Sequence, residues 1–201
     1  MIGEPGPGTA TGSRATVAGA EEAWRRTVHV ASGGLGPLAA RLPPAVAALA
    51  FAALVAAAGG AETIRLASPR VHAWIDRIAG SLFRPAEAAG VSGATTLALG
   101  YALAWWLFPV GAAERAILVA ALSDPMAATV GTRFGAGVGK SWAGSAACAA
   151  TATLVLLLTR VPVPVAVAAG LGAAVAERVP WRGADNVTVP VVVAALLRIL
   201  A

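Results

Sequence analysis

Charged and aromatic residues are both scarce in this sequence of 201 amino acids. Charged residues make up 12% of the chain and aromatic residues 5%, whereas 58% of the residues are hydrophobic and the mean hydropathy is +0.75. A typical soluble domain carries about 25% charged residues. The composition therefore argues against an ordinary soluble domain and predicts an integral membrane protein.

Cysteine and lysine each occur once. The single cysteine, Cys148, excludes an intramolecular disulfide and a metal site built from several cysteines, and its small apolar neighbours indicate a packing role. Lys140 is the one lysine in a chain whose other long basic side chains are all arginine. Lys140 directly follows the glycine-rich residues 131–139, which makes this stretch a candidate functional loop.

Uncharged runs long enough to cross a bilayer recur along the chain. Residues 42–61, 88–113 and 141–159 carry no charge, and each can span a hydrocarbon core about 30 Å thick as a helix. The shorter or interrupted candidates are 116–132, 161–176, 27–40 and 186–197. Together these segments predict an all-α, polytopic membrane protein with about seven transmembrane helices.

Two segments outside these runs have a different character. Residues 1–22 are rich in Gly, Pro, Thr and Ser and contain no apolar run, which predicts a disordered tail before a single transmembrane domain over 23–201. Between the second and third predicted spans, Val71, Trp74 and Ile78 recur at helical spacing, with arginines at other positions. This pattern predicts an amphipathic helix that lies on the membrane surface.

Most basic residues fall on one side of the predicted bundle, in the tail and in the connections after the second, fourth and sixth spans. By the positive-inside rule this side is cytoplasmic, which predicts a prokaryotic inner-membrane protein whose chemistry faces the cytoplasm. Because the positive charges are spread over several juxtamembrane loops, we expect no nucleic-acid partner.

The stretch GTRFGAGVGKS, residues 131–141, resembles part of a phosphate-binding loop. Its last three residues match the end of G-x-x-x-x-G-K-[ST], but Phe134 occupies the first glycine position and a membrane helix is expected before it instead of a strand. A P-loop NTPase is therefore excluded. A glycine-rich turn with positive charge and a following helix N-terminus still suits a phosphate anion. An ordinary juxtamembrane loop explains the same residues.

Asp124 lies within an otherwise apolar run. A carboxylate at membrane depth is unfavourable unless a cation or metal pairs with it, so we expect this residue to be functional. The alternative is a structural ion pair with Arg133. Pro125 follows directly and removes a backbone N–H, which predicts a break or kink in the helix.

Several short motifs follow one another along the chain: RRTVHVASGG, ETIR, RPAEAAGVSGATTLALGYAL, ALSDPMAATVGTRFG, GKSWAGSAACA and ERVPWRGADNVTVPVV. Their order resembles the CTP-dependent lipid-alcohol kinases, which include phytol kinase, dolichol and polyprenol kinase and CTP-dependent diacylglycerol kinase, and which are similar to phosphatidate cytidylyltransferases. The resemblance covers residues 24–195. It implies a polytopic enzyme that takes CTP as phosphoryl donor, needs Mg²⁺ and phosphorylates the hydroxyl of a membrane-embedded alcohol. Ser123 departs from the family, which usually has glycine before the aspartate.

The resemblance and the residues together suggest individual roles. Asp124 would bind Mg²⁺, with Asp185 as a second ligand, and Lys140 would hold the CTP phosphates. The other residues expected around the phosphates are Arg133, Gly135, Gly137, Gly139, Ser141, Arg25 and Arg26. His29, in the signature R-R-x-x-H, is a candidate for the base that accepts the proton of the alcohol, for a phosphate or cytosine ligand, or for a purely structural residue. Asp124 is its rival as the base.

Further polar residues are expected to organise the same site. The predicted ion pairs are Glu62 with Arg65 and Glu87 with Arg84. A salt bridge at a helix end explains each pair equally well. Glu177 and Asp185 can bring more carboxylates to the rim, although Asp185 or Asn186 can also be a simple N-cap of the last helix.

Two other functions remain open on the sequence. An enzyme like the phosphatidate cytidylyltransferases would transfer the nucleotide moiety and release pyrophosphate. A small transporter would more often place ionisable residues near the bilayer midplane and show internal repeats, and we find no convincing repeat. The acceptor can be of the phytol, polyprenol or diacylglycerol type. The small-residue segments 93–100 and 143–153 permit close helix packing, a lipid groove or a homodimer.

Overall fold

The computed structural model describes residues 22–79, 90–134, 140–179 and 183–200. Within these ranges every regular element is a helix, so the predicted all-α fold is confirmed. The helices are the segment 22–32, α2 (Leu35–Ala39), α3 (Pro44–Ala67), α4 (Pro69–Ala79), α5 (Gly93–Leu107), α6 (Val110–Phe134), α7 (Trp142–Leu158), α8 (Val163–Glu177) and α9 (Asp185–Leu200). Most of the predicted tail lies outside the described residues, and Glu22 is already helical.

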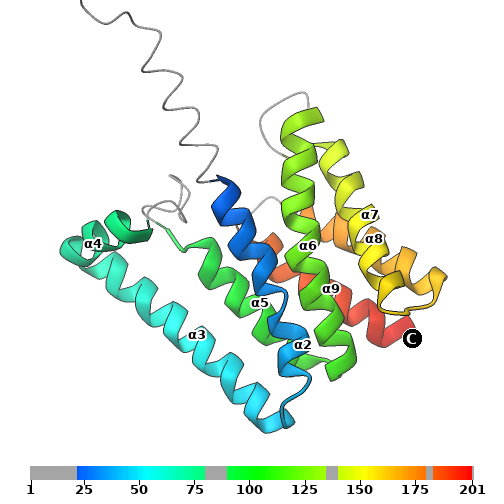
Figure 1. Ribbon diagram of the computed structural model, residues 1–201, viewed down its shortest axis with the longest axis horizontal. Helices are drawn as coiled ribbons and strands as arrows, with labels where there is room; N and C mark the ends of the chain where they lie inside the picture. The colour runs from blue at the N-terminus through cyan, green and yellow to red at the C-terminus, as the bar shows by residue number, and fades with distance from the viewer. Residues whose placement is uncertain (1–21, 80–89, 135–139, 180–182, 201) are drawn as a thin grey trace, which may run out of the picture.

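The long helices run alternately in opposite directions, so their connections gather at two ends of the bundle (Figure 1). At one end Asp185 accepts a hydrogen bond from Lys140, and Asn186 donates to the carbonyl of Gly93, which brings the starts of α5, α7 and α9 together. We call this the polar end and define it by Gly93, Lys140 and Asp185. The start of α6 and the C-terminal end of α9 lie at the opposite end (Figure 1).

A proline corrects one boundary expected from the uncharged runs. The run 88–113 does not form one helix, because α5 ends at Leu107 and α6 begins at Val110. Phe108 is extended, and the carbonyl of Pro109 accepts the first amide hydrogen bonds of α6. Proline restricts the preceding residue to extended backbone and is favourable at a helix start, so the chain turns here.

A second proline, Pro125, does not break the helix that contains it. The sequence predicts a break or kink at this position, but α6 continues as helix from Val110 to Phe134. The proline ring is buried, and α6 packs extensively on α7 and α9. Tertiary packing maintains a helix that propensity alone would interrupt. Asp124 is therefore held inside a continuous helix.

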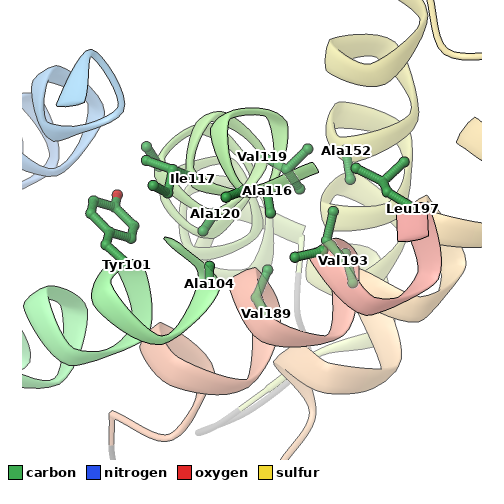
Figure 2. Packing of buried hydrophobic residues seen from close by; sticks show 14 of the residues in the cluster. Tyr101, Ala104, Ala116, Ile117, Val119, Ala120, Ala152, Val189, Val193 and Leu197 are labelled. Carbon is green, nitrogen blue, oxygen red and sulfur yellow. The ribbon is translucent and has the colours of Figure 1, made fainter. Parts of the chain in front are cut away.

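Small side chains form most of the core. Figure 2 shows Ala104 of α5 gathered with Ala116 and Ala120 of α6, next to Val189 and Val193 of α9. All five side chains are buried. Such short side chains bring helix backbones close together, and the packing of α5, α6 and α9 fixes where their polar ends meet.

Two glycines mark the closest helix contacts. A Cβ atom added at Gly100 would collide with the backbone carbonyl of Asn186, so α5 and α9 cross in near backbone contact. A Cβ atom at Gly144 of α7 would lie 2.8 Å from the carbonyl oxygen of Ala127 in α6. In both small-residue segments, 93–100 and 143–153, the glycine therefore allows two helices to pack closely.

The helix predicted between the second and third spans is present as α4. It follows α3 after Ser68 and leaves the bundle at an angle (Figure 1). Trp74 and Ile78 are exposed on it, while Val71 is half-buried. The described helix ends at Ala79, and the rest of the predicted amphipathic segment lies outside the described residues.

Helix α3 is the one helix in the described ranges that is long and apolar enough to cross a membrane. α7 and α8 are apolar but shorter. Only Ala47, Phe51, Glu62 and Arg65 of α3 are buried. A long apolar helix with so little burial differs from the core helix of a soluble domain.

Candidate functional site

A cavity of about 150 Å³ opens at the polar end, between the segment 22–32, α5, α6 and the start of α9. The charged and polar side chains that line it are Glu22, Arg25, Arg26, His29, Ser32, Asp124 and Asn186. Apolar atoms complete the wall, including those of Val28 and Leu97. Four of the residues singled out from the sequence as catalytic or phosphate-binding, Arg25, Arg26, His29 and Asp124, thus lie around one cavity.

His29 and Asp124 form the centre of this cavity. His29 Nδ1 lies 3.9 Å from Asp124 Oδ2, which is within ion-pair range but longer than a hydrogen bond. The other ring nitrogen of His29, Nε2, is buried and has no hydrogen-bond partner among the described residues. A buried polar atom without a partner is rare in proteins and often marks a functional group. A carboxylate beside one ring nitrogen can orient an imidazole while the other nitrogen accepts a proton.

Two arginines line the cavity, together with the carboxylates of Glu22 and Asp124. Arg25 and Arg26 both form ion pairs with Glu22, and the Arg26 Nε to Glu22 Oε1 distance is 3.0 Å. Arg26 also donates from Nη1 to Thr129 Oγ1 over 2.9 Å, which links the first helical segment to α6. Thr129 is itself anchored, because its hydroxyl donates to the carbonyl of Pro125.

Tyr101 and Ser32 support the helix that carries His29. The Ser32 hydroxyl donates to the carbonyl of His29 over 2.5 Å and lies 2.9 Å from the hydroxyl of Tyr101. Tyr101 is fully buried on α5, and Figure 2 shows its ring extending from that helix. This chain of contacts connects α5 to the backbone of the base candidate. Tyr101 is not among the site residues predicted from the sequence, although a lone tyrosine in an alanine-rich helix is a usable signal.

Lys140 forms a second polar centre at the same end. Its Nζ atom lies 2.8 Å from Asp185 Oδ2 and 3.2 Å from Glu177 Oε1, and it also donates to the Glu177 carbonyl. Burial alone lowers the pKa of Lys140, but the hydrogen bonds and negative charges of Asp185 and Glu177 outweigh it, so the pKa is raised. Lys140 is therefore a charged link between the ends of α7, α8 and α9.

The same cluster extends along α7 and α8. Glu177 Oε2 accepts a hydrogen bond from Ser145 over 3.2 Å, and Ser145 Oγ accepts one from Arg178 over 3.1 Å. The Arg178 guanidinium lies 4.1 Å from the centre of the Trp142 ring, which is a cation–π contact. Glu177 is buried and fully engaged in holding two helix ends together.

The two centres meet at the first turn of α9. Asp185 binds Lys140, and the next residue, Asn186, lines the cavity. Asn186 Nδ2 donates to the Gly93 carbonyl over 3.1 Å and to Thr96 Oγ1 over 3.0 Å. Lys140, predicted to hold phosphate together with a metal-binding Asp124, is not among the residues that line the cavity and pairs with Asp185 and Glu177 instead.

The remaining phosphate-loop residues divide into three groups. Ser141 is the N-cap of α7 and accepts a hydrogen bond from the Gly144 amide over 3.0 Å, so it opens the helix as predicted. Arg133 lies at the exposed end of α6, 5.7 Å from the centre of the Phe134 ring. The predicted glycines of the loop, Gly135, Gly137 and Gly139, lie outside the described residues.

The predicted ion pair of Glu62 with Arg65 is present and buried. Arg65 also donates to the Gly90 carbonyl over 2.7 Å, and Glu62 Oε2 accepts a hydrogen bond from Thr95 over 3.1 Å. These contacts fasten the start of α5 to α3, and the start of α5 forms one wall of the cavity. The other predicted pair, Glu87 with Arg84, lies outside the described residues.

The donor groups of the cavity suit a magnesium ion that arrives with a nucleotide. Asp124 presents a carboxylate there, and the described residues contain no cluster of three or more His, Cys, Asp and Glu side chains arranged for a metal. Mg²⁺ commonly keeps several waters and is held by one or two carboxylates together with substrate phosphates. Asp185 stays a prediction as a second ligand, since its Oδ2 accepts the Lys140 hydrogen bond.

Comparison with known proteins returned no family model, no curated protein and no solved structure that matches the chain. The family resemblance read from the motifs therefore stays a prediction. The chemistry of the cavity is the remaining basis for a functional proposal.

Proposed function

We propose that the protein is a membrane-embedded kinase that transfers the γ-phosphate of CTP to the hydroxyl of a lipid alcohol. One observation carries the proposal: a cavity combines two arginines with a histidine that has a carboxylate beside Nδ1 and no hydrogen-bond partner for Nε2 within the described part of the chain. Phosphoryl transfer needs positioning, neutralisation of phosphate charge and a group that takes the proton of the nucleophile. The choice of CTP and of a lipid acceptor rests on the motif resemblance.

The outer surface of the bundle supports a location in the membrane. Leu49 of α3, Leu158 of α7 and Val175 of α8 are 70%, 74% and 73% exposed, and further large apolar side chains are exposed on the same helices. Soluble proteins rarely expose so much apolar surface together. On this basis the segment 22–39 and the helices α3 and α5 to α9 are the proposed crossings, about seven in all. Local bilayer thinning would accommodate the shorter helices.

The arginines supply the phosphate contacts in this proposal. The guanidinium groups of Arg25 and Arg26 present planar sets of donors that match phosphate oxygens. Thr129 fixes the direction of Arg26, so its position does not depend on the ligand alone. Because a preorganised donor needs little rearrangement, it stabilises the charge that moves toward the β-phosphate during transfer.

His29 acts as the base. As the oxygen of the alcohol bonds to the γ-phosphorus and the bond to the β-phosphate oxygen breaks, the hydroxyl proton moves to Nε2 of His29. Asp124 lies on the Nδ1 side, where its negative charge stabilises the imidazolium that forms. Because Nε2 is buried in this structure, the His29 ring must turn toward the cavity before the alcohol hydroxyl can reach it.

Asp124 is also the residue that would hold Mg²⁺, which supplies charge neutralisation on the phosphate oxygens when it is bound. A carboxylate has two oxygen atoms, so contact with His29 through Oδ2 is compatible with this second role. The cavity lies at the end of the bundle that we assign to the cytoplasm, at a depth that suits an alcohol headgroup. Val28 and Leu97 offer apolar contacts for the carbon atoms beside the hydroxyl.

The proposal is tested with purified protein in lipid nanodiscs, given CTP labelled at the γ- or the α-phosphate together with phytol, a polyprenol or diacylglycerol. A kinase transfers the γ-label to an organic-extractable product of one alcohol, and Asp124→Asn abolishes the transfer. Transfer of the α-label with release of pyrophosphate would instead assign nucleotidyl transfer. Incorporation of neither label with any alcohol would overturn the enzyme assignment and leave the transporter.

A further inference from the structure

Glu22 lies where a phosphate group would be expected to bind. Its two carboxylate oxygens contact different arginines, Oε2 with Arg25 and Oε1 with Arg26. A carboxylate and a phosphate group can each offer two oxygens to the parallel N–H donors of a guanidinium, so arginine binds both anions. Both arginines that line the cavity are therefore already paired with a side chain of the protein.

The ion pairs between Glu22 and the two arginines lie in the wall of the cavity. Glu22 lines the same cavity as His29 and Asp124. Arg26 stays directed by Thr129 of α6, a contact that does not involve Glu22. If Glu22 moved away, Arg26 would remain directed by Thr129 and would still reach the cavity that it lines.

The cavity is small for a ligand site, which is consistent with a side chain occupying part of it. With Glu22 among its walls the cavity measures about 150 Å³, whereas sites for whole drug-sized ligands usually measure about 300–1,000 Å³. The described cavity is therefore about half the size of the smallest of these sites. Because Glu22 is part of its wall, outward movement of that side chain would leave more room beside the two guanidinium groups.

We propose that the Glu22 carboxylate is an internal substitute for a phosphate group, and that a di- or triphosphate ligand displaces it from Arg25 and Arg26. The inference rests on the proposed function only in naming CTP as the natural ligand. In the empty cavity the Glu22 carboxylate neutralises the two neighbouring guanidinium groups. Its displacement sets an affinity penalty that every phosphate ligand must overcome.

The size of the penalty follows from exposure. The Glu22, Arg25 and Arg26 side chains are 36%, 25% and 28% exposed, so solvent screens the ion pairs and makes them weaker than buried ones. Removing the carboxylate while keeping a side chain of the same shape should therefore tighten phosphate binding by about three- to tenfold.

The experiment measures the binding of inorganic pyrophosphate to the purified protein by isothermal titration calorimetry at one fixed salt concentration. Glu22→Gln is expected to bind pyrophosphate about three- to tenfold more tightly than the wild type. Glu22→Asp keeps the charge and is expected to stay near the wild type. The matched control is Glu114→Gln, which removes the same charge in α6 near its start, at the opposite end of the bundle.

Adding Arg25→Gln tests whether the gain in pyrophosphate affinity comes from the arginines that Glu22 releases. In the double variant Glu22→Gln with Arg25→Gln, the gain should shrink, because one of the two released donors is missing. Unchanged or weaker binding by Glu22→Gln would overturn the proposal and make Glu22 a positioning residue for the arginines. An equal gain in Glu114→Gln would also overturn it, since overall charge would then explain the effect.

These outcomes are independent of catalysis. Pyrophosphate binding requires no turnover and no lipid, so tighter binding by Glu22→Gln would support the substitute even if the labelled-CTP experiment detected no kinase. Conversely, a working kinase whose Glu22→Gln variant shows no gain in pyrophosphate affinity would keep the proposed function and exclude this role for Glu22. In an active enzyme the same variant should lower the KM for CTP.

Discussion

Asp124, in the interior of α6, holds its carboxylate 3.9 Å from Nδ1 of His29, which comes from the first helical segment of the chain. The two residues lie far apart in the sequence and line one cavity. The second nitrogen of His29 is buried and has no partner in the residues that the structure describes. A proton accepted there would make the ring positive, and the Asp124 carboxylate lies on the side where it stabilises that charge. This relationship leads to the first prediction.

His29→Gln should reduce the rate of phosphoryl transfer by about a hundredfold to ten-thousandfold, the usual contribution of a general base. Glutamine keeps much of the size and polarity of histidine but cannot accept the proton of the alcohol at neutral pH. We expect kcat to fall while the KM for CTP changes little. Steady-state kinetics with saturating alcohol measures both quantities.

The chain offers a matched control, because its one other histidine is His72 on α4. His72→Gln makes the same chemical change beside Arg65 and Pro69, away from the residues that line the cavity. It should leave kcat within about twofold of the wild type. Equal losses in the two variants would remove His29 from the role of base.

Tyr101→Phe should lower kcat about three- to tenfold and the free energy of unfolding by about 1 kcal/mol, because it removes one buried hydrogen bond that steadies the His29 helix. The tyrosine does not line the cavity and acts through Ser32. The measurement is kcat and KM together, with KM for CTP expected to stay constant.

Ser32→Ala provides the second arm of this test. If both residues act through the same contact, the double variant should be no slower than the slower single variant. Losses that simply multiply would mean that Tyr101 and Ser32 affect the reaction independently, which contradicts a shared positioning role.

The all-α fold could be predicted from the sequence, because uncharged runs long enough to form helices recur along it. Two patterns in the sequence point to Asp124 and His29: a carboxylate within an apolar run and a histidine that follows two arginines. Their proximity was not predictable, because it depends on how the first segment packs on α6. There a Cβ at Gly33 would lie 2.7 Å from Cβ of Ala121.

The sequence did not predict which ion pairs Glu22 and Lys140 form. Glu22 falls at the end of the predicted tail, yet it is helical and pairs with two arginines. Lys140 was assigned to phosphate from its glycine-rich context, but Asp185 and Glu177 engage it in this structure. Long flexible side chains have several partners within reach, and tertiary packing decides among them.

Lys140→Met should destabilise the protein by about 2–3 kcal/mol, because two largely buried carboxylates lose their counter-charge. The measurement is the free energy of unfolding in detergent. Lys140→Arg keeps the charge and should lose less. If Lys140 instead serves phosphate binding alone, Lys140→Met would raise the KM for CTP and leave stability unchanged.

The stabilisation by Lys140 should also depend on pH in the alkaline range. Its pKa in the folded protein is raised above the ordinary value of 10.5, so its contribution is fully present below that value. The contribution is lost as the pH rises through the folded pKa, when the ammonium deprotonates. We expect the stability difference between wild type and Lys140→Met to be constant near neutral pH and to shrink above pH 10.5. As the chain has one lysine, the difference isolates this group.

Gly100→Ala should disrupt the crossing of α5 and α9, since the added Cβ would collide with the carbonyl oxygen of Asn186. Neither backbone can move without shifting its helix, so we expect a loss of about 2–3 kcal/mol in the free energy of unfolding. Activity should fall as well, because Asn186 lines the cavity. Gly59→Ala is the control: a Cβ there meets no atom within 4 Å, and alanine favours the helix by about 0.5–1 kcal/mol. Equal stability of the two variants would show that α5 and α9 do not cross at Gly100.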